Sequence, residues 1–432
     1  MLFFLKKGHF FVIKSQSCVV LYLTLHLTSS LIYIKIKMTE YNTMQIERIV
    51  SALNSRTRYK RHALLKKLRK SIKEITSTQT TNPFVRSVYS FSNHSPSMMA
   101  YLAYKSDLGL IGIFDMESLE GVKEFKKGCK LFGISTCVGT DVQVDPHIAD
   151  SGASNCGFIG IADQYKRQAS KFLKPYRERH RERVAEMVDR INKKIKSLGI
   201  KISFVYDVYI LSKYIRGGTI TEKHVWLALA NKLVNTYGKG ENLIGKLETI
   251  GEISDKERVL LGDVTNPFYE YDLAKFLKII FRFDQKPHAD HKDIINFANT
   301  INALTLYELR FGSNGREQEI VESVKTEGYD ILAFDPRVMK TEEVENLVAL
   351  CQKAEIIALP LEIIDFPRKK FDTSITDKNL LSTLEKNAWA IAGHELLVSK
   401  GEGGFKDLGD ISFDKKIEIL AGVIHPQYFD KN

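Results

Sequence analysis

The 432-residue chain lacks the short motifs that mark many nucleotide-dependent and hydrolytic enzymes. It has no P-loop, no dinucleotide-binding glycine fingerprint, no HExxH helix and no GxSxG turn. Its five cysteines are odd in number and form no CxxC pair. This pattern argues against a disulfide framework and a zinc site, and it favours a reducing, cytoplasmic location. Repeats of solenoid period and low-complexity segments are also missing.

A long uninterrupted apolar segment is missing as well. The most apolar stretch near the start, residues 18–27, follows three lysines but is interrupted by Thr24 and His26. It falls short of the ~20 apolar residues that a bilayer span needs. We therefore expect residues 1–37 to be an extension upstream of the working protein, with a signal peptide or short anchor as the alternative.

Positive charge is concentrated at one end of the chain. Residues 1–75 hold 15 lysines and arginines against 3 acidic residues, whereas the remainder holds 48 against 49. The body is therefore neutral, which argues against nucleic acid and membrane as partners. Residues 38–80 form a predicted basic helical arm. We expect its apolar stripe to pack against the body, with nucleic-acid or membrane contact as the alternative.

Two segments repeat one design, in which apolar strands that end on carboxylates flank a helix. In the first, the strand Leu110–Phe114 ends at Asp115, and the strand 134–138 leads to Asp141. In the second, the strand 329–334 ends at Asp335, and the strand 356–361 ends at Glu362. Unbroken apolar runs predict strands buried on both faces of a parallel sheet.

The carboxyl ends of parallel strands meet at one edge of a sheet, where α/β folds assemble their functional groups. The acids at these ends are therefore expected to converge. The alternative is that they are solvated strand ends and helix caps, as in any α/β protein.

A helical block separates the two units. Residues 145–160 are rich in glycine, serine and aspartate and are predicted to form a loop. Residues 163–197 have the charge and spacing of a long helix, and residues 200–260 are mainly helical in pattern. We therefore expect α/β parts at 81–144 and 261–432, with a helical insertion at 145–260.

Two histidines lie next to recognisable local patterns. His394 follows the apolar run Ala388–Ala392, which is predicted to be a strand, so His394 is expected at a strand end. His224 follows Thr221 at the start of an amphipathic helix, where it can simply fill the first turn.

Several of these stretches together resemble the PHP (polymerase and histidinol phosphatase) superfamily. The resemblance lies in Ser95–Ala103 leading to Leu108–Asp115, in Leu119-Glu120-Gly121, and in Gly139-Thr140-Asp141. It continues through Thr221–His224 and Gly393–Val398, and it covers most of the chain from about Thr81. The fold class that it implies is α/β, a distorted seven-stranded (β/α) barrel of PHP type with the helical insertion and the basic arm.

The resemblance implies a metal-dependent phosphoesterase acting on a small phosphorylated compound, with manganese, magnesium or zinc at the strand ends. The implied metal ligands are Asp115, Asp141, Glu362, Asp365 and His394, of which His394 is also the candidate general acid.

The chain departs from the family pattern at most of its histidines. Met116 replaces one histidine, residues 82–89 contain none, and Tyr307-Glu308 stands where a histidine-proline pair is expected. The alternative is therefore a catalytically inactive PHP-like fold that holds no metal and serves as a ligand- or partner-binding protein.

Overall fold

The computed structural model describes residues 44–54, 57–71, 78–146, 148, 154–281, 283, 289–371 and 373–425. The predicted extension at 1–37 lies outside these residues. Within them, no helix combines the length and the apolar character that crossing a membrane requires.

The core of the fold is one seven-stranded sheet whose strands follow one another in chain order. The strands are β1 (Thr81–Val85), β2 (Leu110–Phe114), β3 (Ser135–Val144), β4 (Ser154–Ile159), β5 (Leu304–Leu309), β6 (Ile331–Phe334) and β7 (Ile357–Pro360). Only β4 runs antiparallel to its neighbours; the other pairings are parallel. Both predicted strand–helix–strand units are present, so the predicted α/β class is confirmed.

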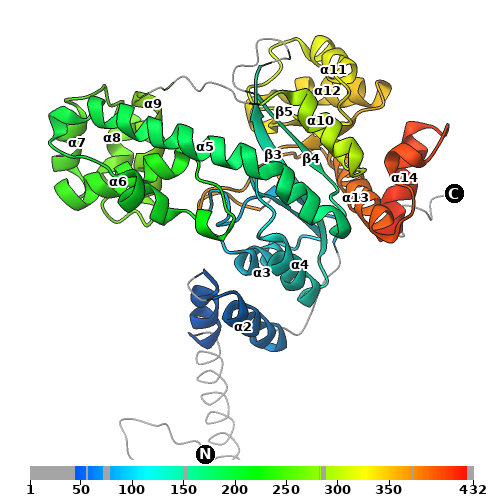
Figure 1. Cartoon of the computed structure of the whole chain (residues 1–432), viewed down its shortest axis with the longest axis horizontal. Coiled ribbons are helices and arrows are strands. Elements are labelled where there is room, and N and C mark those ends of the chain that lie inside the picture. The colour runs from blue at the N-terminus through cyan, green and yellow to red at the C-terminus, as the bar shows by residue number, and fades with distance from the viewer. Residues whose placement is uncertain are drawn as a thin grey trace, which may run out of the picture.

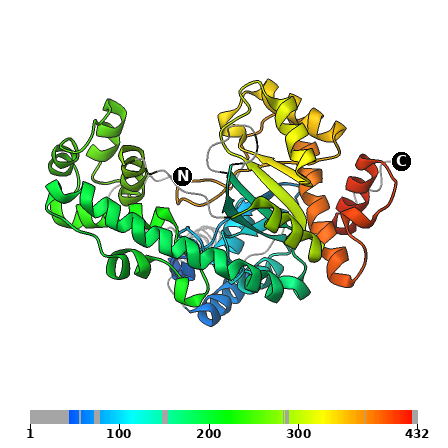
Figure 2. The same cartoon turned by 45° about the horizontal axis from the view of Figure 1, so that its top comes forward.

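The sheet curls until its first and last strands approach each other (Figure 2). Val85 forms a parallel bridge with Ile364, which follows β7. The amide of Arg86 donates to the Ile364 carbonyl at 3.0 Å, and the amide of Ile364 donates to the Phe84 carbonyl at 3.0 Å. This seam joins β1 to the segment after β7, so the two ends of the strongly curled, half-barrel sheet are in contact.

Helices cover both faces of the sheet (Figures 1 and 2). The helices that flank the sheet are α3 (Pro96–Lys105), α4 (Val122–Leu131), α10 (His291–Thr300), α11 (Glu317–Thr326), α12 (Thr341–Lys353), α13 (Lys378–Lys400) and α14 (Phe413–Ile424). One apolar cluster joins one face of the strands to α13 and α14. A second, larger cluster joins the opposite face to α3, α4, α10, α11 and α12.

A helical unit with its own apolar core projects away from the sheet (Figure 1). Its helices are α5 (Lys166–Lys194), α6 (Glu222–Tyr237), α7 (Glu241–Leu247), α8 (Asp255–Gly262) and α9 (Tyr269–Ile280). Short turns of 3-10 or π type lie at Asp163–Tyr165, Lys196–Leu198, Phe204–Val208, Tyr209–Leu211, Tyr214–Arg216, Pro336–Val338 and Phe405–Asp407.

The bounds of this unit differ from the predicted insertion at 145–260. The predicted loop contains β4, a full member of the sheet, and α9 extends the unit past residue 260. Polar Ser154 and Asn155 together with Gly157 give β4 little of the apolar pattern by which the other strands are identified.

The basic arm packs against the body of the protein. Residues 44–54 are helical, and α2 (Arg58–Ser71) lies beside α4. Leu65 and Leu68 are buried in the larger apolar cluster. The guanidinium of Arg61 forms two hydrogen bonds, of 2.7 and 2.6 Å, with the Glu124 carboxylate. The described part of the arm is therefore docked by its apolar side, as expected.

Candidate functional site

The sheet changes from apolar to polar toward the carboxyl ends of its parallel strands. Side chains alternate between the two faces of a strand, so Leu304, Leu306 and Glu308 of β5 share one face. The two leucines belong to the apolar cluster beneath α13 and α14, and Glu308 continues the same row past it. In β3 the same alternation carries Cys137 on to Asp141. These rows deliver buried charges to one edge of the half-barrel.

Arg86 lies at the centre of this edge, directly after β1. Its Nη2 donates to Asp141 Oδ2 at 2.6 Å, and its Nη1 donates to Ser90 Oγ at 3.3 Å. The side chains of Arg86 and Asp141 are only 4% and 0% exposed. Burial lowers the pKa of Arg86, but the carboxylates of Asp141, Glu308 and Asp365 outweigh that effect and raise it. Arg86 is therefore a permanent buried cation.

A second arginine approaches the same carboxylates from the rim. Arg310 Nε donates to Glu308 Oε2 at 2.6 Å, and Arg310 Nη2 lies 3.4 Å from Asp141 Oδ2. That oxygen also accepts from Asn155 Nδ2 at 2.8 Å. Burial raises the pKa of Glu308 to about 7, and the positive charge of Arg310 only partly opposes the shift.

Asp115 lies next to the Arg86–Asp141 pair, and its carboxylate is bound by Ser87 in the segment that follows β1. The amide and the hydroxyl of Ser87 each donate to one of its oxygens at 2.6 Å. Burial raises the pKa of Asp115 to about 6, against the effect of the two Ser87 hydrogen bonds. Both oxygens of Asp115 are therefore already engaged by the protein.

Two lysines share the single carboxylate of Asp365. Lys223 of α6 pairs with Asp365 Oδ2, and Lys369 Nζ lies 2.6 Å from Asp365 Oδ1. Burial would raise the pKa of Asp365, but the two ammonium groups hold it below its usual range. Burial lowers the pKa of Lys223 to about 8, although Asp365 opposes the shift. The two lysine side chains are 32% and 30% exposed, so they lie at the rim.

The helical unit contributes an ionic clamp beside this cluster. His180 of α5 places Nδ1 3.1 Å from Glu117 Oε2 and Nε2 3.1 Å from Glu222 Oε1. Burial lowers the pKa of His180, but the two carboxylates outweigh it and raise the pKa to about 10. One turn further along α5, Arg183 Nη1 donates to Gln143 Oε1 of β3 at 2.8 Å. The clamp fixes α5 across the strand ends.

Three buried atoms of the cluster have neither a hydrogen-bond nor an ion-pair partner in the described part of the chain; a fourth, Asp365 Oδ1, lacks a hydrogen bond but lies 2.6 Å from Lys369 Nζ. Within the part of the chain that the structure describes, Arg86 Nε, Asp141 Oδ1 and Glu308 Oε1 have no hydrogen-bond partner. One is a donor and two are acceptors. Buried polar atoms without partners are uncommon because each costs desolvation free energy. These three atoms can therefore still bond to a polar species that both accepts and donates.

The structure brings together part of the predicted ligand set. Asp115, Asp141 and Asp365 lie around Arg86 at the carboxyl edge. Glu362 lies at the end of β7 but turns to another partner, the amide of Ser374, which donates to its Oε1 at 2.8 Å. Their roles as metal ligands remain predictions.

The predicted position of His394 is wrong. The run Ala388–Ala392 belongs to helix α13, not to a strand, and the helix is buried on all sides along this run. His394 Nδ1 accepts from the Phe405 amide at 3.0 Å, and Nε2 lies 2.9 Å from the carbonyl of Asn302, which precedes β5. His394 is therefore at the opposite edge of the sheet. Burial lowers its pKa to about 4, so it is a neutral structural residue.

The residues at the strand ends do not fit a metal ion. Among the described residues, no group of three or more histidine, cysteine, aspartate or glutamate side chains is arranged to hold one. The centre of the cluster is taken by the guanidinium of Arg86, and Asp115 and Asp365 are engaged by protein donors. The arrangement can instead recognise charged and hydroxyl groups through its own side chains.

Sequence analysis missed the groups that organise this site, above all Arg86, Lys223 and Arg310. Glu308 was noted only as a replacement for an expected histidine. A signal for Glu308 was available, since it is the one charged residue in the mainly apolar strand β5. Thr221 and His224 behave as predicted: the Thr221 amide donates to His224 Nδ1 at 3.0 Å, which closes the first turn of α6.

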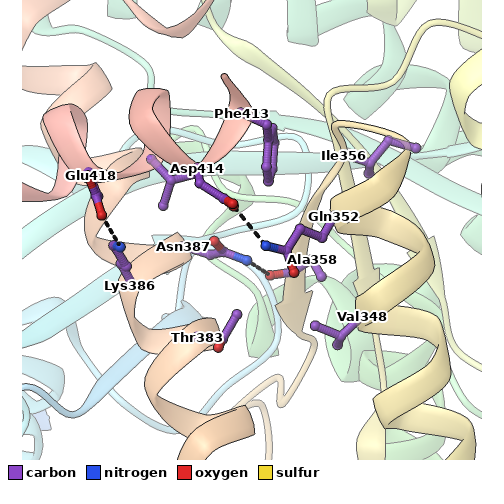
Figure 3. A pocket seen from close by; sticks show the side chains of 11 residues that line it. Val348, Gln352, Ile356, Ala358, Thr383, Lys386, Asn387, Phe413, Asp414 and Glu418 are labelled. Carbon is purple, nitrogen blue, oxygen red and sulfur yellow. Dashed lines mark hydrogen bonds and ion pairs between the residues drawn. The ribbon is translucent and has the colours of Figure 1, made fainter. Parts of the chain in front are cut away.

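A separate cavity of about 260 Å³ lies between α12, α13 and α14 (Figure 3). Its polar side chains pair with one another or with the backbone: Lys386 with Glu418 at 3.3 Å, Gln352 with Asp414 at 2.8 Å, and Asn387 with the backbone. Since these partners are supplied locally, the cavity lacks the unused capacity found at the strand ends.

Comparison with known proteins gives distant structural similarity alone. No known family and no curated protein matches the chain in sequence. A structure described as a metal-dependent phosphoesterase from Bifidobacterium adolescentis has a TM-score of 0.48 and 15% identity, covering 71% of this chain and 96% of that one. An amidohydrolase from Chromobacterium violaceum, with bound sulfate and no metal, has a TM-score of 0.48 and 13% identity, covering 69% and 92%.

Proposed function

We propose that this protein binds a small phosphorylated compound that carries hydroxyl groups, and that it does so without a metal ion. The binding site is the charged cluster of Arg86, Asp141, Glu308 and Asp365 with its rim lysines. The observation that carries the proposal is the set of three buried, unpartnered atoms on Arg86, Asp141 and Glu308.

These atoms define the neutral part of the ligand. Carboxylate oxygens accept hydrogen bonds, so Asp141 Oδ1 and Glu308 Oε1 favour hydroxyl donors. Arg86 Nε favours an oxygen acceptor close by. A polyhydroxylated compound supplies both kinds of group, and its binding would remove the desolvation cost of all three atoms.

The rim supports the anionic part of the ligand. Lys223 and Lys369 together carry two positive charges against the single charge of Asp365. The surplus charge lies on part-exposed ammonium groups, and a phosphate can reach these without first being buried. Hydrogen bonds between charged groups are about twice as strong as neutral ones, which favours phosphate over a neutral substituent.

Hydrolysis of such a compound is a second candidate function. The pKa of Glu308 is about 7, so its carboxyl group is partly protonated near neutral pH and can serve as a general acid. Perturbed pKa values cluster at catalytic sites, and Asp115 and Lys223 share this property here. Phosphate release from a ligand in metal-free buffer, abolished by Glu308→Gln, would support hydrolysis; release only with added Mn²⁺, Mg²⁺ or Zn²⁺ would restore the metal-dependent prediction.

The binding proposal is tested by calorimetry of the whole chain against sugar phosphates and inorganic phosphate in buffer containing a chelator. Lys223→Met and Lys369→Met should each weaken binding about tenfold or more, because each removes a charged hydrogen bond. Lys325→Met on the exposed surface of α11 is the matched control and should bind as the wild type does. Equal affinity in all four proteins, or no binding by the wild type, would refute the proposal.

A further inference from the structure

Arg86 occupies a position that differs in kind from those of the other cations of the site. Arg310, Lys223 and Lys369 reach in from the rim and are each about a third exposed. Arg86 is buried and follows β1, with carboxylates contributed by β3, β5 and the segment after β7 around it. Arg86 is thus a buried cation among acids from several strand ends, at the edge of the sheet where α/β folds assemble their functional groups.

We propose that the Arg86 guanidinium takes the place of a metal ion, so that removing its side chain creates a divalent-cation site at Asp141 and Glu308. This inference does not rest on the proposed ligand, since it concerns only the charge inside the protein.

The pairing around Asp141 supports this assignment. Asp141 Oδ2 receives Arg86 at 2.6 Å and Asn155 at 2.8 Å, while Oδ1 of the same carboxylate has no partner among the described residues. Glu308 is divided in the same way, with Oε2 on Arg310 and Oε1 unpartnered. Removing Arg86 takes one positive charge away from these two carboxylates and leaves Arg310, which pairs with Glu308 Oε2 and lies 3.4 Å from Asp141 Oδ2. Oxygen ligands of this kind suit Mg²⁺, Ca²⁺ and Mn²⁺.

A guanidinium suits this position for a physical reason. Its planar array of five donors can bond several carboxylates at once, and it stays charged at any pH at which proteins fold. A metal ion gives the same neutralisation but depends on supply and dissociates. The protein therefore carries its own cation, which explains why histidines are not needed at these strand ends.

The experiment compares thermal unfolding and Mn²⁺ binding in the full chain. Arg86→Met keeps the bulk of the side chain but removes the charge; in chelator its Tm should fall by on the order of 10 °C. Saturating Mn²⁺ should restore several degrees and bind at one ion per chain. The wild type should bind none and show no change in Tm. Arg86→Met/Asp141→Asn removes both charges; it should be more stable than Arg86→Met in chelator and should lose the response to Mn²⁺.

Arg61→Met is the matched control. Arg61 is another buried arginine, and it pairs with Glu124, outside the cluster. Its loss should lower Tm without producing an Mn²⁺ site. A wild-type protein that holds a stoichiometric divalent ion, or an Arg86→Met protein that binds none, overturns the proposal. If Arg86→Met does not fold, the double variant decides: soluble yield no better than that of Arg86→Met also overturns it.

Discussion

His180 Nε2 of α5 lies 3.1 Å from Glu222 Oε1 of α6, with the opposite ring nitrogen on Glu117. Both nitrogens face carboxylates, so the ring is an imidazolium that joins two elements of the helical unit to the end of β2. This small clamp holds α5 over the strand ends, and its charge state sets how firmly it does so.

The clamp predicts a dependence of stability on pH. The folded pKa of His180 is raised from 6.5 to about 10, so its stabilisation is complete below pH 6.5 and is lost as the pH rises through about 10. His180→Gln should lose on the order of 4 kcal/mol of unfolding free energy at neutral pH and show no such alkaline decline. Urea unfolding across this range measures it. His62→Gln, at a half-buried histidine outside the clamp, is the control and should keep the alkaline decline. An identical decline in His180→Gln and the wild type would contradict the prediction.

His394 should act in folding and not in chemistry. His394→Gln removes the acceptor for the Phe405 amide in a buried position, at a cost of about 1–3 kcal/mol. Ligand affinity and any phosphate release should be unchanged. In the wild type, the folded pKa of about 4 means that this residue contributes stability above pH 6.5, which is lost as the pH falls toward 4. Loss of activity at full stability would instead support the predicted catalytic role.

Glu308 should make the folded protein less stable as the pH rises. Its pKa increases from 4.5 to about 7 on folding, so the contribution present below pH 4.5 is lost as the pH rises through about 7. Glu308→Gln should abolish this decline, which is about 3 kcal/mol for a buried group. Unfolding curves on either side of the interval measure the effect. The same substitution at the exposed Glu345 should leave the decline intact; parallel curves for Glu308→Gln and wild type would show that Glu308 is ionised throughout.

Gly393 allows α13 and α14 to touch. A Cβ atom at this position would lie 1.8 Å from the Leu420 carbonyl oxygen, so Gly393→Ala must push the helices apart. We expect a loss of about 1–3 kcal/mol in unfolding free energy. Gly245 of α7 has open space around it, and Gly245→Ala should gain about 0.5–1 kcal/mol. Similar changes in both variants would mean that helix propensity, not close packing, governs the two sites.

The Arg61–Glu124 pair should control docking of the arm. Glu124→Gln leaves a buried guanidinium without its counter-charge, and such losses cost about 3–5 kcal/mol. Hydrogen exchange in residues 57–71 should rise sharply, as should proteolysis there. Asp163→Asn removes a pair with Lys126 in which Asp163 is 59% exposed, and it should have little effect. Unchanged exchange in Glu124→Gln would show that apolar contacts alone hold α2.

Sequence patterns predicted the parts of the fold that have one strong local signal. The strands around Ile111 and Leu332 are apolar throughout because both faces are covered, and this was visible in the sequence. Helix α13 was mistaken for a strand because Ala388–Ala392 is buried on every side, which erases the helical period.

The site was harder to predict than the fold. The acids Asp115 and Asp141 could be found from their positions after strands. The pairing of Asp141 with Arg86 could not, because residues 55 positions apart meet only through the order of the strands.

The seam between Val85 and Ile364 connects the charged cluster to the contact between the two ends of the sheet. Arg86 is the next residue after one side of that joint, and Asp365 and Lys369 follow the other side. A molecule that binds Arg86 and Lys369 together would link the two sides of this seam. Binding of such a molecule to the cluster would then stabilise the contact between the two ends of the curled sheet.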